Sequence, residues 1–139
     1  REIVRKYMTA KHFVVVGEKY CQAIAKETAL MLSEISEVFA EALTISELKY
    51  GMINKIDSEV VVLCLLPKDS LYEENLRVAQ AMHNQGARVV IISEENSNEL
   101  MNNFDDVITV TPSKDIVAPI LLLMVMQLFV FYLGKAKKA

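Results

Sequence analysis

The chain has few of the residues on which several functional classes depend. It contains two cysteines, two histidines, four glycines, three prolines and no tryptophan. Cys21 and Cys64 are too few for a disulfide framework, and because each falls within an apolar segment we expect reduced, buried thiols. His12 and His83 have no partners at the spacing of a metal site or a catalytic triad, so surface or core roles are expected. The sequence therefore predicts no metal and no cofactor.

Glycine is scarce where a phosphate-binding loop would need it. The first apolar run ends at Gly17, and the next residue is Glu18, whose carboxylate would repel a phosphate. A dinucleotide site needs repeated glycines at this point, and the Walker A pattern is absent as well. The loop at 67–70 has no glycine and offers only Lys68 and one hydroxyl; a lone lysine of this kind is usually solvated. We expect the isolated chain to bind phosphorylated ligands weakly or not at all.

No excess charge of one sign points to a polyanionic partner. The 139 residues include 15 basic and 18 acidic ones, for a net charge of −3, and a nucleic-acid reader would usually show a basic face. The 53% of hydrophobic and 24% of charged residues exclude a disordered or collagen-like chain. The chain shows no signal peptide, so a cytoplasmic protein is expected, and its start at Arg1 suggests a fragment of a longer protein.

One long hydrophobic run lies at 116–133, where only Pro119 and Gln127 interrupt the apolar residues. Its length is at the lower limit for a membrane span, and the lysines that follow it could form a cytoplasmic flank. The alternative is a buried helix. We favour the buried helix over the membrane span, because the rest of the chain has the pattern of a packed domain whose sheet needs a covering helix.

Apolar runs alternate with helical patterns along the chain. The runs are continuously apolar, which is typical of strands buried on both faces of a parallel sheet. The pattern predicts a single doubly wound α/β domain, in which function is sought in the loops after the strands. The expected strands are 11–17, 37–43, 59–66, 88–93 and 106–110. The expected helices are 18–36, 44–49, 70–85 and 116–133, with 96–103 a loop or a loose helix.

Local signals indicate where these helices begin and end. Thr44 is an expected N-cap, and Glu47 would complete its capping box. Asp69 or Ser70 is the expected N-cap of helix 70–85, and Gly86 the residue after its end. In helix 18–36 the residues predicted to share an apolar face are Tyr20, Ile24, Met31 and Ile35.

Two carboxylates share one stripe of helix 18–36. Glu27, Met31 and Glu34 are spaced i, i+4 and i+7. A carboxylate poised near a carbon-bound proton is what acid–base chemistry on a sugar requires. The other interpretation is a helix rim with two solvated glutamates, and the pattern alone leaves both open.

The stretch 25–57, AKETALMLSEISEVFAEALTISELKYGMINKID, resembles the sugar isomerase (SIS) family. It is most similar to the second SIS half of the glucosamine-6-phosphate synthases, also called glutamine–fructose-6-phosphate aminotransferases. The resemblance implies a three-layer α/β/α sandwich with a five-stranded parallel sheet. It also implies that 1–139 is one SIS domain, the C-terminal half of a longer tandem-SIS protein. The matching positions are Glu27, Ala29, Leu30, Leu32, 34–36, 40–42, 47–49, Gly51 and 56–57.

The resemblance also assigns roles to single positions. Glu34 matches the family's catalytic glutamate, which moves a proton between C1 and C2 of the sugar. The family's lysine falls on Met31 and its ring-opening histidine on Tyr50, while a further lysine would lie beyond Ala139. Tyr50 could act as a weak acid or a hydrogen-bond donor, although the reference pKa of a tyrosine phenol, near 10, suits proton transfer at pH 7 poorly. The remaining candidates for substrate contact are Glu27, Glu47 and Lys49.

Two functions from different classes follow from the resemblance. The first is the isomerase half of an enzyme that acts on substrates of the fructose 6-phosphate or glucosamine 6-phosphate type. Such an enzyme would couple aldose–ketose isomerisation to amine transfer, deamination or deglycation, and the isolated chain is expected to be inactive. The second is a non-catalytic phosphosugar-sensing or dimerising module. In either case the expected partners are a phosphorylated sugar or amino sugar, a second copy of the chain and an N-terminal SIS half, with no nucleic acid and no membrane.

Overall fold

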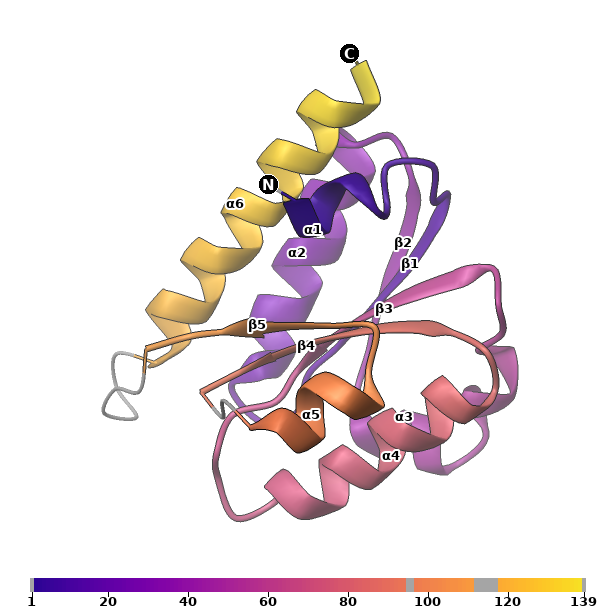
Figure 1. Ribbon diagram of the computed structural model, residues 1–139, viewed down its shortest axis with the longest axis vertical. Helices are drawn as coiled ribbons and strands as arrows, with labels where there is room; N and C mark the ends of the chain where they lie inside the picture. Colours follow the sequence, from indigo (N-terminus) through magenta and orange to yellow (C-terminus); the bar gives the residue numbers. More distant parts are fainter. Residues whose placement is uncertain (1, 95–96, 112–117, 139) are drawn as a thin grey trace.

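Five parallel strands form one sheet in the order β2-β1-β3-β4-β5 (Figure 1). The computed structural model describes residues 2–94, 97–111 and 118–138. The order places β1 between β2 and β3, so the chain reverses direction across the sheet there, as in a doubly wound fold. The strands are β1 His12–Val16, β2 Phe39–Leu43, β3 Val60–Leu65, β4 Arg88–Ser93 and β5 Asp106–Thr109. All five predicted strands are confirmed.

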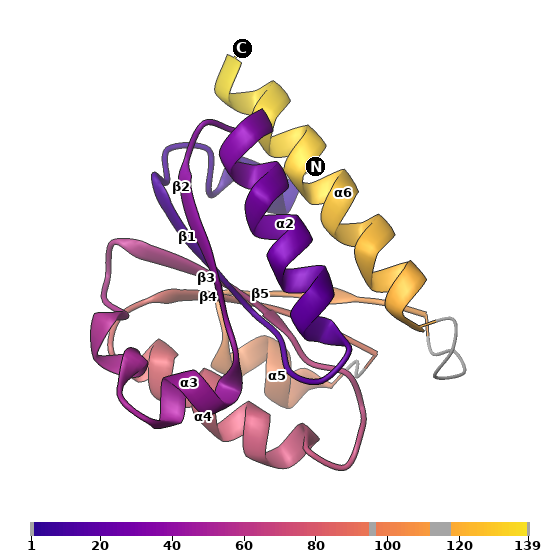
Figure 2. The same ribbon diagram turned by 180° about the vertical axis from the view of Figure 1, so that it is seen from behind.

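Helices cover both faces of this sheet, which confirms the three-layer sandwich (Figures 1 and 2). On one face lie α1 (Glu2–Arg5), α2 (Cys21–Ile35) and α6 (Ala118–Lys138). On the other lie α3 (Ile45–Lys49), the 3-10 turn η1 (Met52–Lys55), α4 (Tyr72–Asn84) and α5 (Asn98–Asn103). Strand β3 is buried at every residue, as its continuous apolar sequence predicts.

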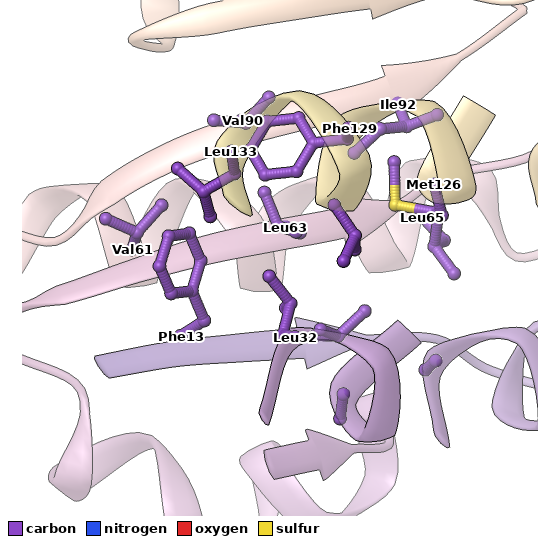
Figure 3. Close-up of a cluster of buried hydrophobic side chains, with 14 of the residues drawn as sticks. Phe13, Leu32, Val61, Leu63, Leu65, Val90, Ile92, Met126, Phe129 and Leu133 are labelled. Carbon is purple, nitrogen blue, oxygen red and sulfur yellow. The ribbon is translucent and has the colours of Figure 1, made fainter. Parts of the chain in front are cut away.

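The predicted C-terminal helix belongs to the core. Figure 3 shows Phe13 and Leu63 of the sheet beside Leu32 of α2 and Phe129 and Leu133 of α6. The helix extends to Lys138, beyond the predicted end at 133, while positions 116 and 117 of the prediction lie outside the described residues. By length and composition alone α6 could cross a membrane, but core helices of soluble proteins pass the same test.

Helix ends agree with the sequence in two cases and differ in one. Thr44 and Glu47 form the expected capping box, and Gly86 follows α4 with a φ of +97°. The predicted cap at Asp69 or Ser70 is wrong: the N-cap is Leu71, which makes no side-chain cap bond. Asp69 instead accepts a hydrogen bond from the Leu71 amide at 2.9 Å. This closes a turn ahead of the helix, so that α4 begins at Tyr72.

The buried face of α2 is only in part the predicted one. Ile24 is buried, but Ile35 is 43% exposed and Met31 is half-buried. Small residues take the inner positions and let the sheet and α6 approach closely. Both thiols are buried as expected, and burial raises the pKa of Cys21 and of Cys64 to about 12. The buried residues of α2 are Cys21, Ile24, Ala25, Thr28, Ala29 and Leu32.

Candidate functional site

Glu34 lies in the last turn of α2, with its side chain exposed to solvent. Helix α2 begins after the carboxyl end of β1 and ends shortly before the amino end of β2. The carboxylate therefore stands at the amino edge of the sheet. Glu27 is exposed two turns earlier on the same helix. Met31, between them, packs its side chain partly against the core, so no cation separates the two carboxylates along this stripe.

A hollow of about 550 Å³ opens next to the end of α2. Three segments line it: residues 8, 9 and 11 ahead of β1, residues 35–38 between α2 and β2, and residues 134, 137 and 138 at the end of α6. We call this the amino-edge hollow. Glu37 lines it with a φ of +53°, a left-handed conformation that is uncommon for a residue other than glycine. Glu34 directly precedes the lining turn.

Lys137 ties two of these segments together. Its Nζ donates hydrogen bonds to the carbonyl oxygens of Met8 at 2.7 Å and Ala10 at 2.6 Å. Burial, and after it the neighbouring charge of Lys11, lowers the pKa of the Lys137 ammonium. No sequence pattern indicates this contact, because the partners are backbone atoms at the opposite end of the chain.

The candidates on α3 lie on the other face of the sheet. Glu47 is engaged in the capping box, where its carboxylate accepts from the Thr44 amide at 3.0 Å. Lys49 forms an ion pair with Glu74 in the first turn of α4. Tyr50 follows α3 and is 90% exposed, which leaves its hydroxyl free to reach another molecule. The structure thus groups Glu47, Lys49 and Tyr50, and separates all three from Glu34.

Glu18, which sequence reasoning noted only as repelling phosphate, has a structural role. Its carboxylate accepts hydrogen bonds from the Ser46 amide at 3.1 Å, the Ser46 hydroxyl at 3.3 Å and Gln22 at 3.1 Å. Burial opposes ionisation, but these hydrogen bonds outweigh it, and the pKa of Glu18 lies below its ordinary value. The carboxylate therefore occupies the start of α3, where an anion would otherwise find free amides.

Both histidines lie near acidic side chains. The Nε2 atom of His83 is 3.4 Å from an oxygen of Asp105, and that of His12 is 3.8 Å from an oxygen of Glu41. Within residues 2–94, 97–111 and 118–138, no three His, Cys, Asp or Glu side chains are grouped so that they could hold a metal ion.

Known proteins of similar sequence indicate the family to which this chain is related. The glutamine–fructose-6-phosphate aminotransferase of Thermotoga maritima is 30% identical over 137 residues, 99% of this chain and 23% of that protein. The enzyme of the same name from Thermus thermophilus is 34% identical over 129 residues, 93% of this chain and 21% of that protein. This chain therefore spans less than a quarter of the length of these relatives.

A solved structure and a family model agree with these relatives. The C-terminal domain of glucosamine-fructose-6-phosphate aminotransferase from Francisella tularensis superposes with a TM-score of 0.87 at 26% identity. The match covers 99% of this chain and 39% of that structure. Residues 6–133 match the model of the SIS domain. With this match over nearly its whole length, the chain belongs to the SIS domain family.

Proposed function

We propose that this chain is the C-terminal SIS half of a longer protein that isomerises a phosphorylated sugar or amino sugar. The observation that carries the proposal is the place of Glu34. It is an exposed carboxylate in the last turn of α2, one residue before the segment that lines the amino-edge hollow, and by resemblance it matches the family's catalytic glutamate. The coupled reaction is amine transfer, deamination or deglycation of a substrate like fructose 6-phosphate or glucosamine 6-phosphate.

In this proposal Glu34 acts as the base of the isomerisation. Its carboxylate removes the proton from C1 of the sugar and returns it to C2, while the hydroxyl proton on C1 passes to the oxygen on C2, so that the carbonyl moves from C2 to C1. A base works best when its pKa lies near the working pH. Since Glu34 is exposed in this chain, substrate and a second domain would have to cover its carboxylate and exclude water before it acts.

The chain supplies only part of the binding site. Glu18 fills the start of α3, and the loop at 67–70 has no glycine, so we assign the phosphate to the N-terminal SIS half. Glu34 and Tyr50 lie on opposite faces of the sheet. If both act on one sugar, they come from two copies of the chain. The proposed assembly is thus a homodimer of tandem-SIS chains in the cytoplasm.

An apolar stripe on α6 is the surface proposed for this assembly. Ile120, Met124, Leu128 and Phe131 are each more than half exposed and are spaced i, i+4, i+8 and i+11 along the helix. This spacing puts them on one side, away from the core. Large apolar residues gathered on one face are typical of an interaction site. This chain covers 39% of the chain in the Francisella structure, so that chain is long enough to contain a second unit of this size.

A non-catalytic phosphosugar-sensing or dimerising module is the second candidate. Met31 and Tyr50 favour it, because they replace the lysine and histidine that the family uses for catalysis. An isotope experiment on the full-length protein separates the two functions. Fructose 6-phosphate deuterated at C1 should transfer label to C2 of the product or lose it to water if the chain is an isomerase half. Tight sugar-phosphate binding without any transfer or loss of label would favour the module.

A further inference from the structure

The three segments around the amino-edge hollow are joined to one another pairwise. Helix α6 meets the end of α2 at Gly134, where a Cβ atom would lie 3.0 Å from the Ile35 Cγ2 atom and 3.1 Å from the Ile35 carbonyl oxygen. One turn away, the Ser36 hydroxyl donates to the Val130 carbonyl oxygen at 3.4 Å. A side chain at 134 would therefore require Ile35 at the end of α2 to shift.

The segment ahead of β1 completes the ring of contacts. The Phe39 amide donates to the Lys11 carbonyl oxygen at 2.9 Å, which joins this segment to the α2–β2 turn. The two hydrogen bonds from Lys137 to Met8 and Ala10 join it to α6. The turn that follows Glu34 is therefore in contact with α6 on one side and with the segment ahead of β1 on the other. Lys137 joins these two segments to each other.

We infer that Lys137 and Gly134 are positioning residues that fix the carboxylate of Glu34. The inference rests on the proposed function, because it gives Glu34 the part of the base. Glu37 supports it independently: a residue other than glycine stays in a left-handed conformation only where its surroundings enforce it. The contacts at Ile35, Ser36 and Phe39 provide that constraint on both sides of Glu37.

Lys137 differs from the exposed lysines near the end of α6 in the burial and the hydrogen bonds of its ammonium group. Its ammonium group is partly withdrawn from water, and burial and Lys11 together make the charged form less stable. The two short bonds to backbone carbonyl oxygens compensate for that cost. Lys135 lies two residues earlier on the same helix with an exposed side chain. Lys135 therefore offers a matched control that removes the same charge without touching the ring.

The first test uses steady-state kinetics of the full-length protein. Lys137→Met keeps the aliphatic stem and removes the donor; it should lower kcat about 10- to 100-fold with KM nearly unchanged. Lys135→Met should leave both constants unchanged. Added to Glu34→Gln, Lys137→Met should cause no further fall, because it acts through Glu34. A fall that multiplies with that of Glu34→Gln, or an equal fall in Lys135→Met, would overturn the inference.

The second test does not depend on activity. Amide hydrogen exchange at residues 34–38 should become at least about tenfold faster in Lys137→Met, with β3 unchanged, and Gly134→Ala should act in the same direction. Unchanged exchange in both variants would overturn the inference. If exchange rises while Glu34→Gln leaves kcat intact, the ring holds the turn but the proposed base is wrong, and the positioning role fails with it.

Discussion

Glu34 and Tyr50 lie on opposite faces of one parallel sheet, Glu34 on the α2–α6 side and Tyr50 beside the α3–α4 side. Their helices pack into two separate cores, which the sheet divides. The sheet therefore lies between the two side chains of one chain. Under the proposed function, a catalytic site that uses both is assembled from two chains, which makes the role of Tyr50 testable by mixing variants.

Tyr50→Phe should slow the turnover of a cyclic sugar phosphate and spare an open-chain analogue. The reason is that the phenol hydroxyl, which is removed, is the only group of Tyr50 that can donate a proton to the ring oxygen. Steady-state rates on the two substrates measure the effect. Co-assembly of Tyr50→Phe with Glu34→Gln should restore part of the activity that each variant lacks. Equal slowing of both substrates would remove Tyr50 from the ring-opening step.

Phe129→Ala should destabilise the domain by about 3–5 kcal/mol, since a buried aromatic side chain is lost and a cavity remains. Phe129 is 3% exposed and packs between α6 and the sheet, whereas Phe131 is 56% exposed on the same helix. Phe131→Ala should change the free energy of unfolding by no more than about 0.5 kcal/mol in the monomer. Urea denaturation of both variants measures the difference. Similar losses would mean that α6 is not packed as described.

Leu128→Glu together with Phe131→Glu should weaken self-association without unfolding the domain. Both residues lie on the exposed stripe of α6, where a charge costs little in the monomer and much in an apolar interface. Sedimentation at several concentrations up to tens of micromolar measures the dimer fraction, since association follows mass action. A monomeric wild-type chain throughout this range would contradict the proposed interface. Partition of the wild type into lipid vesicles would instead assign the stripe to a membrane.

Glu18→Gln should flatten the loss of stability in acid. The pKa of Glu18 is lower in the folded chain than its ordinary value of 4.5. Its stabilising contribution is therefore present above pH 4.5 and disappears as the pH falls through the folded-state pKa. Denaturation at pH 7 and at pH 3 should show a smaller difference for Glu18→Gln than for the wild type. Glu27→Gln, which changes an exposed carboxylate, should keep the wild-type difference.

The parts of the fold that depend on neighbouring residues were predictable from the sequence. The β-branched run of β3 predicted a buried strand, and the spacing of Thr44 and Glu47 predicted a capping box, because both signals are local. Asp69 misled because the same side chain suits a helix cap and a tight turn. Ile35 misled because periodicity does not show which helix rows approach a neighbour closely.

Local sequence signals could not predict contacts between residues that are far apart in the chain. Glu18 and Ser46 are 28 residues apart, and Lys137 and Met8 are 129 apart. No sequence pattern predicts either contact, since an acidic residue after a strand and a lysine at a helix end are common on solvated surfaces. The candidate role of Glu34 came from the family motif, whereas the amino-edge hollow, whose lining begins one residue later, came from the structure.

The most direct test compares Glu34→Gln with Glu27→Gln in the full-length protein. Both glutamates are exposed on α2, and the amide preserves the shape of each side chain. Loss of a positioned base lowers kcat by roughly 10²–10⁴-fold. We predict such a fall in kcat for Glu34→Gln on the phosphosugar substrate, with KM nearly unchanged, and a much smaller effect for Glu27→Gln. Small and equal effects of the two substitutions would contradict the account and leave both carboxylates as a solvated helix face.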